Sequence, residues 1–215
     1  MSHTHLLFVL RCKTTKTFLF SFLFILTTLY ADAQSLQWAK AVLGNSLVNS
    51  VGIVSDNSGN CYQTGRFHAM ADFDSGPGFD TINAAAISGY ASSYAAYITR
   101  TDAAGNHVWA KAFIPYSFGA TSMSLALDRD HSGSIISIGK FGQTVDFDPG
   151  PGLDTLSASM LYDMPYIAKL DSNGNYIWAK QFENTVQSDY NNVYAVKTDA
   201  SNNIYVAGGF SGTLD

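Results

Sequence analysis

The stretch Asp72-Phe73-Asp74-Ser75-Gly76-Pro77-Gly78-Phe79-Asp80 recurs from position 146 as Asp-Phe-Asp-Pro-Gly-Pro-Gly-Leu-Asp, an offset of 74 residues. Other motifs keep nearly the same register. Trp-Ala-Lys stands at 38–40, 109–111 and 178–180, and Gly65, Gly139 and Gly208 each lie two residues before a phenylalanine. Several motifs in one register indicate a chain built from a repeat of about 70 residues.

Each repeat has the pattern of four strands. Short apolar segments at 51–55, 61–67, 96–101 and 107–113 recur at 122–127, 135–141, 166–170 and 176–182. Turns such as Asp56-Asn57-Ser58-Gly59-Asn60 and Asp102-Ala103-Ala104-Gly105-Asn106 join them, and Asp and Gly are residues that favour tight hairpin turns. The prediction is an all-β fold, a β-propeller segment made of four-stranded antiparallel blades.

The composition agrees with many strands and turns. Of the 17 acidic residues only Glu183 is a glutamate, and aspartate is the acid that favours turns over helices. The formal net charge of -5 disfavours a nucleic-acid binder, which would need a basic surface. Basic residues are scattered singly, which disfavours phosphate groups or a membrane surface as the partner.

Residues 1–33 have the pattern of a signal peptide. Arg11, Lys13 and Lys16 precede an apolar run at 18–31, and Ala31-Asp32-Ala33 fits a signal peptidase site. We therefore expect a secreted or cell-surface protein without membrane insertion after cleavage, with an uncleaved anchor as the alternative. Cys61 is then the only mature cysteine, so an internal disulfide is excluded.

The repeat register divides the rest of the chain. We expect a lone N-terminal strand (36–42) and linker within 34–50, blade 1 at 51–113, blade 2 at 114–182, and the first half of a third blade at 183–215. These are roughly 2.6 units, whereas propellers close with about 4–8 blades. The expectation is a fragment of a longer protein, and the alternative is a ring assembled from several chains.

The motifs resemble those of the bacterial seven-bladed β-propeller repeat (SBBP repeat) family. The resemblance rests on Asn60-Cys61-Tyr62-Gln63-Thr64-Gly65, on Asn203-Ile204-Tyr205-Val206-Ala207-Gly208 and on Lys169-Leu170-Asp171, with the Asp-Phe-Asp-Pro-Gly-Pro-Gly motif, and covers roughly residues 36–215. Two positions depart from the pattern, at Arg100 and at Ser134-Ile135-Ile136. The family implies an exported, often surface-associated protein that commonly ends in a secretion-sorting domain, and it implies no reaction.

The aspartates of the recurring motif are the candidate metal ligands. Alternate residues of an extended strand point to the same side, so Phe73 and Phe147 would pack inward and leave paired carboxylates outside. Oxygen ligands at this spacing suit Ca²⁺, and the alternative is that the carboxylates bind the amides of the following Gly-Pro-Gly turn. The candidates are Asp72, Asp74, Asp80, Asp146, Asp148 and Asp154. Asp128-Arg129-Asp130-His131-Ser132-Gly133 also resembles a calcium loop, but its equivalents lack the second acid, which favours a plain hairpin.

Other chemistry-bearing residues fit packing better than catalysis. Trp38, Trp109 and Trp178 recur at one blade position, which favours packing between blades over sugar stacking. Cys61 aligns with Ile135 and Ile204, as a buried small hydrophobe would. The histidines occupy non-equivalent places, and no HExxH or GxSxG motif is present in the sequence.

These observations favour a non-catalytic exported scaffold or surface binding module over an enzyme. Its partner would be a protein or glycan on a surface, bound by the long loops opposite the short hairpins. The alternative is an exported propeller enzyme acting on glycans, with catalytic residues in blades absent from this chain.

Overall fold

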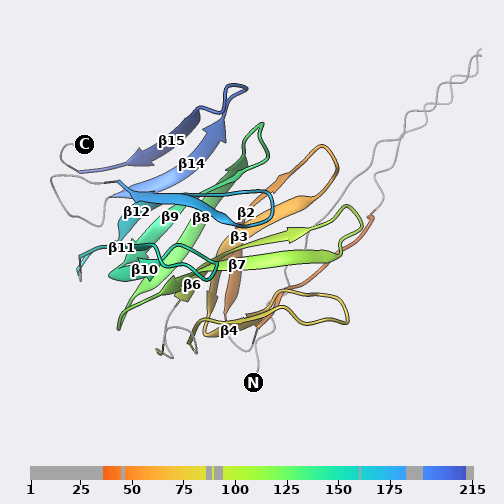
Figure 1. Cartoon of the computed structure of the whole chain (residues 1–215), viewed down its shortest axis with the longest axis horizontal. Coiled ribbons are helices and arrows are strands. Elements are labelled where there is room, and N and C mark those ends of the chain that lie inside the picture. The colour runs from red at the N-terminus through yellow and green to blue at the C-terminus, as the bar shows by residue number, and fades with distance from the viewer. Residues whose placement is uncertain are drawn as a thin grey trace, which may run out of the picture.

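The computed structural model describes residues 36–44, 47–85, 89, 94–159, 161–182 and 191–211 (Figure 1). The expected signal peptide at 1–33 lies outside the described residues. Every element with defined bounds is a β-strand, and all strand pairs are antiparallel, which confirms the all-β prediction.

The two full repeats each form a four-stranded meander. The first comprises β2 (Val48–Ser55), β3 (Cys61–His68), β6 (Tyr94–Thr101) and β7 (His107–Pro115). The second comprises β8 (Thr121–Arg129), β9 (Ile135–Gly142), β12 (Met164–Leu170) and β13 (Tyr176–Gln181). In both, each strand pairs with its neighbour in the meander, so the eight strands expected from the repeat are confirmed. Two strands of a third unit follow, β14 (Asn192–Thr198) and β15 (Ile204–Gly209).

The sheets lie against one another in layers, as Figure 1 shows. The central strands β3, β9 and β12 are buried almost continuously, because both of their faces meet a neighbouring layer. One core joins units one and two through Tyr62, Ile98 and Leu127, and another joins unit two to β14 and β15 through Ile138 and Val196.

The recurring Asp-Phe-Asp segment forms a hairpin that joins one repeat to the preceding one. In the first copy β4 (Met70–Asp72) and β5 (Thr81–Asn83) pair, and β4 also pairs with β1 (Leu43–Gly44). In the second copy β10 (Thr144–Asp146) pairs with β11 (Thr155–Ser157) and with β7 of the first unit. The registers are equivalent, since Leu43 pairs with Asp72 as Ile114 pairs with Asp146.

The lone strand expected at 36–42 is not formed. The structure assigns no strand to these residues, and pairing begins only at Leu43–Gly44. The physical reason is the partner: β7 and β13 each pair along their length with the third strand of their own unit. No such third strand for this segment is present among the described residues, so only the contact with β4 remains.

A bulge in the first strand explains the recurring glycine. The register shifts between Ser50 and Gly52 opposite β3, and equivalent shifts occur in β8 and β14. At Gly65, Gly139 and Gly208 a Cβ atom would overlap the backbone of the bulged strand. Only glycine allows the two strands to approach this closely.

Candidate functional site

The aspartates of the first hairpin bind the hairpin's own backbone. Asp72 Oδ1 accepts hydrogen bonds from the amides of Asp74 (3.1 Å) and Asp80 (2.9 Å), and Asp74 Oδ1 accepts one from Gly76 (2.7 Å). The Phe73 amide donates to the Asp80 carbonyl oxygen at 3.0 Å and closes the turn. These bonds are the ones expected if the carboxylates shape the Gly-Pro-Gly turn.

The second hairpin repeats this geometry. Asp146 Oδ1 accepts from the amides of Asp148 and Asp154, each at 3.0 Å, and Asp148 Oδ1 accepts from Gly150 at 2.8 Å. Burial raises the pKa of Asp146, and the nearby charges of Asp148 and Asp154 raise it further, while the two amide hydrogen bonds oppose the rise.

The candidate ligands do not converge into a multidentate cluster. Within the described ranges no group of three or more His, Cys, Asp or Glu side chains is placed to hold a metal ion. The six aspartates lie in two separate hairpins, with three in each. In each hairpin Oδ1 of the first aspartate, Asp72 or Asp146, already accepts two backbone amides. Calcium binding at these hairpins is not tested by these contacts, which favour the alternative that the carboxylates shape the turn.

The remaining motif carboxylates tie each hairpin to the fourth strand of its own unit. Asp80 Oδ2 lies 2.6 Å from Nε2 of His107 and accepts the Ala110 amide at 3.0 Å. In the second copy the Tyr176 hydroxyl donates to Asp154. We expected this loop on the face opposite the short hairpins, but it folds back and reaches the beginning of β7 and β13. The reason is that β4 pairs antiparallel with β1 and β10 pairs antiparallel with β7, so each runs back along an earlier strand.

The phenylalanine of each hairpin points into the core, as predicted. Phe73 packs against Phe67 and Tyr97, with ring centroids 5.4 and 4.8 Å away. Phe147 packs against Phe141 and Tyr166 at the same two distances. Each full unit therefore contains an equivalent aromatic triad, one ring of which comes from the hairpin.

Four short turns of the described chain share one hydrogen-bond pattern. In each, the aspartate accepts hydrogen bonds from the amides two and four residues later and from the side-chain amide of an Asn. These aspartates are Asp56, Asp102, Asp171 and Asp199. Hydrogen bonds from Asn106 lower the pKa of Asp102. For Asp171 burial acts in the opposite direction, but the bonds from Asn175 prevail and its pKa is also lowered.

The calcium-like loop at 128–133 is a hairpin of the same kind, as predicted. Asp130 accepts the Ser134 amide at 2.8 Å and pairs with Lys169 at 2.8 Å, while its side chain is fully buried. Asp128 Oδ2 accepts the Thr198 amide at 2.7 Å, so it connects unit two to the third unit. Both carboxylates therefore have protein partners.

The recurring tryptophans pack between units. Trp109 Nε1 donates to the Ser172 carbonyl oxygen in the turn of the next unit, and Trp38 Nε1 donates to that of Ala103, both at 3.3 Å. Trp178 packs against the core that joins unit two to the third unit. This confirms the prediction that the tryptophans pack between units, in preference to forming an exposed surface for stacking on sugars.

Cys61 and the described histidines each have defined surroundings. Cys61 is buried, as predicted. His68 packs against Tyr94 with tilted rings whose centroids are 4.9 Å apart, and the His131 amide donates to Asn202. His107 contacts Asp80 across the hairpin joint, an arrangement that the sequence spacing did not indicate.

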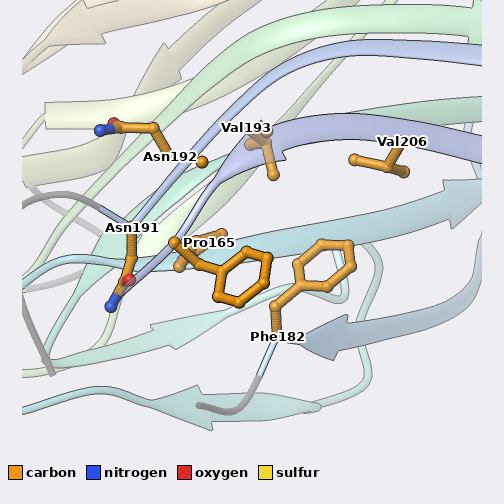
Figure 2. Close-up of a pocket in the computed structure, with 9 residues that line it drawn as sticks. Pro165, Phe182, Asn191, Asn192, Val193 and Val206 are labelled. Atoms are coloured by element: carbon orange, nitrogen blue, oxygen red, sulfur yellow. The ribbon is translucent and has the colours of Figure 1, made fainter. Parts of the chain in front are cut away.

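Sequence reasoning missed an apolar groove between the second and third units. Its volume is about 200 Å³. The walls include Pro165 of β12, Phe182 just after β13, Val193 of β14, Val206 of β15 and Phe210 (Figure 2). The signal that could have found it is the repeat register, because Phe182 and Phe210 are the equivalents of Phe113 and Phe141, which lie in the core between units one and two.

No family model matches the chain, and no curated protein matches it significantly. In the part of the chain that the structure describes, no helix has the length and apolarity needed to cross a membrane.

Proposed function

We propose that this chain is a segment of an exported β-propeller repeat protein, and that it acts as a non-catalytic scaffold or surface binding module. Support for the propeller comes from the joints between units. The β4–β1 and β10–β7 pairings have equivalent registers, and Trp38 and Trp109 bind the turn of the following unit in the same way. Repeating one joint relates each unit to the next by one operation, which is what a ring of blades requires.

The main support for the proposed binding role is the structure of the two Asp-Phe-Asp hairpins. Their aspartates are engaged with their own backbone and their inner phenylalanines are buried, so the hairpins are rigid. At equivalent positions of the two tips, however, Phe79 is 87% exposed and Leu153 is 58% exposed. Apolar side chains presented on a rigid hairpin suit contact with a protein or glycan surface.

A binding assay with a hydrolysis readout tests this function. The full chain is incubated with immobilised bacterial surface polysaccharides and with whole bacterial cells, and both retained protein and released sugar ends are measured. We expect saturable retention without release. A double variant Phe79→Ser, Leu153→Ser should lose retention, whereas the matched variant Val51→Ser, on an exposed strand position, should keep it.

Two results would contradict the proposal. Time-dependent release of reducing ends or unsaturated sugars would assign the chain to the enzyme class. Retention that is equal for both variants would remove the hairpin tips as the binding surface. The propeller itself is tested by an experimental structure, in which the rotation from unit one to unit two must equal that from unit two to β14 and β15.

A further inference from the structure

An arginine, a histidine and a tyrosine form a cluster at the end of unit one that lies opposite the short turns. His68 of β3 pairs directly with Tyr94 of β6, and Arg66 precedes His68 by two residues, so the three side chains share one face of the sheet. Tyr62 and Ile98 lie on the same face of these two strands and belong to the core that joins units one and two. The cluster therefore stands at the edge of the interface between the units.

Contacts with two uncharged side chains hold the guanidinium of Arg66 in place. Its Cζ atom lies 5.0 Å from the centroid of the Tyr94 ring, which is the geometry of a cation–π contact. Its Nη1 atom lies 4.0 Å from the sulfur of Met123 in β8 of unit two. A thioether is only a weak acceptor, so most of the five guanidinium N–H donors remain available.

The described chain supplies no counter-charge to this cluster. Within it, Arg66 forms no ion pair with a carboxylate. The segments that lead into β2 and β6, residues 45–46 and 86–93, contain no Asp or Glu. The Tyr94 hydroxyl and the buried Nδ1 atom of His68 also form no hydrogen bond with the described residues. A fixed positive charge and a hydroxyl thus lie together without protein acceptors.

The cluster is particular to unit one. At the positions of Arg66, His68 and Tyr94 the second unit has other residues, as the equivalent pairing of β9 and β12 shows. These are Lys140, Gly142 and Asp163. Contacts that serve packing between units recur in both units, as the aromatic triads do. A charged cluster confined to one unit is what a binding site on a repeat scaffold requires.

We propose that the cluster of Arg66, His68 and Tyr94 binds an acidic glycan through the carboxylate of a uronate sugar. The guanidinium presents paired N–H groups that match the two oxygens of a carboxylate. The Tyr94 hydroxyl both donates and accepts, as sugar hydroxyls do, and the His68 ring packs against Tyr94 and positions it. The kind of ligand rests on the proposed function, which includes a glycan partner, but the site shares no residue with the hairpin tips.

Titration calorimetry of the full chain with a tetramer of galacturonate tests this site. The matched ligand is the same tetramer with its carboxylates methyl-esterified, which removes the charge and keeps the sugar rings. We expect saturable binding of the acid form, binding about tenfold weaker for the ester, and weaker binding of the acid form as salt is added. Equal binding of the two forms, or no saturable binding of the acid form, would overturn the proposal. A tetraglutamate peptide that binds as tightly as the sugar would overturn the choice of a glycan.

Variants of the chain locate the binding. Arg66→Gln should weaken it about tenfold, and Arg66→Lys about threefold, because lysine keeps the charge but not the paired donors. Lys140→Gln, at the equivalent position of unit two, should leave it unchanged, and circular dichroism checks that each variant is folded. An equal loss in Arg66→Gln and Lys140→Gln would overturn the site.

The hairpin tips provide the comparison with the proposed function. The double variant Phe79→Ser, Leu153→Ser should bind the acid tetramer as the natural chain does. Binding that this variant loses and Arg66→Gln keeps would place the glycan at the hairpin tips, which would overturn the site at Arg66 and leave the proposed function standing.

Discussion

The indole nitrogen of Trp109 donates a hydrogen bond to the carbonyl oxygen of Ser172, which lies 63 residues further along the chain. Trp38 makes the same bond to Ala103 one unit earlier. The turn that receives each indole contains a glycine, Gly174 or Gly105, at which a Cβ atom would press on the indole ring. Because the fourth strand of one unit contacts the turn of the next, this bond fixes the spacing between units.

Replacing Trp109 should weaken the contact between units. We expect Trp109→Ala to lower the free energy of unfolding by about 3 kcal/mol, because it removes a half-buried ring that packs against Tyr62 and the core between units. Trp109→Phe keeps an aromatic ring at this position. We expect it to lower the free energy of unfolding by about 1 kcal/mol relative to the natural chain, because the indole hydrogen bond is lost. Urea unfolding followed by circular dichroism measures both. A cost for Trp109→Ala no larger than that of Val108→Ala, at the exposed neighbouring position, would contradict the packing role.

The glycine opposite the strand bulge should not tolerate a side chain. In Gly139→Ala the new methyl group would overlap the Met123 carbonyl and lie 2.8 Å from the Tyr166 ring, so we expect a loss of about 3 kcal/mol. The matched variant is Gly150→Ala, whose methyl group would meet only the side chain of Asp148 and should cost clearly less. Equal thermal unfolding midpoints for the two variants would show that the bulge does not require glycine.

The turn aspartates should make stability fall in acid. The pKa of Asp102 is lowered in the fold by its bonds from Asn106, below its ordinary value of 3.8. Its stabilising contribution is therefore present above pH 3.8 and is lost as the pH falls through the lower, folded-state pKa. We expect Asp102→Asn to be less stable than the natural chain at pH 7, and the difference to shrink below about pH 4. Urea midpoints measured from pH 7 to pH 2.5 test this, and a difference independent of pH would refute it.

Asp146 should show the opposite sign. Burial raises its pKa above 3.8, so ionisation opposes folding, and its contribution to stability is greatest below pH 3.8 and declines as the pH rises through the folded-state value. Asp146→Asn keeps an oxygen that accepts the Asp148 and Asp154 amides and removes the charge. We expect this variant to be at least as stable as the natural chain at pH 7 in calorimetry. Clear destabilisation there would mean that the negative charge itself has a structural partner.

Calcium dependence is checked separately by heating the full chain with calcium and with a chelator. Because the hairpin aspartates already bind backbone amides, we expect the melting midpoint to be the same under both conditions. A higher midpoint with calcium, abolished by Asp74→Asn together with Asp148→Asn, would instead identify the hairpins as the metal site.

Local patterns were sufficient to predict the strands and short turns. The segments at 61–67 and 135–141 correspond closely to β3 and β9, because short apolar segments bounded by Asp-Gly turns depend on neighbours in the sequence. The inward direction of Phe73 and Phe147 followed from the alternating side-chain directions of an extended strand. The hydrogen bonds of the turn aspartates are also local, spanning two to four residues.

By itself, then, the sequence determined the repeat, its antiparallel strands and the chemistry of its turns. Only the tertiary structure decided that the first Asp-Phe-Asp hairpin pairs with β1 and the second with β7 of the first unit, that residues 36–42 form no strand, and that a groove lies beside Phe210. The physical reason is that a strand edge and an aromatic side chain are satisfied by partners about 30 to 70 residues away. Which partner is within reach depends on how whole sheets stack, and no local pattern encodes that.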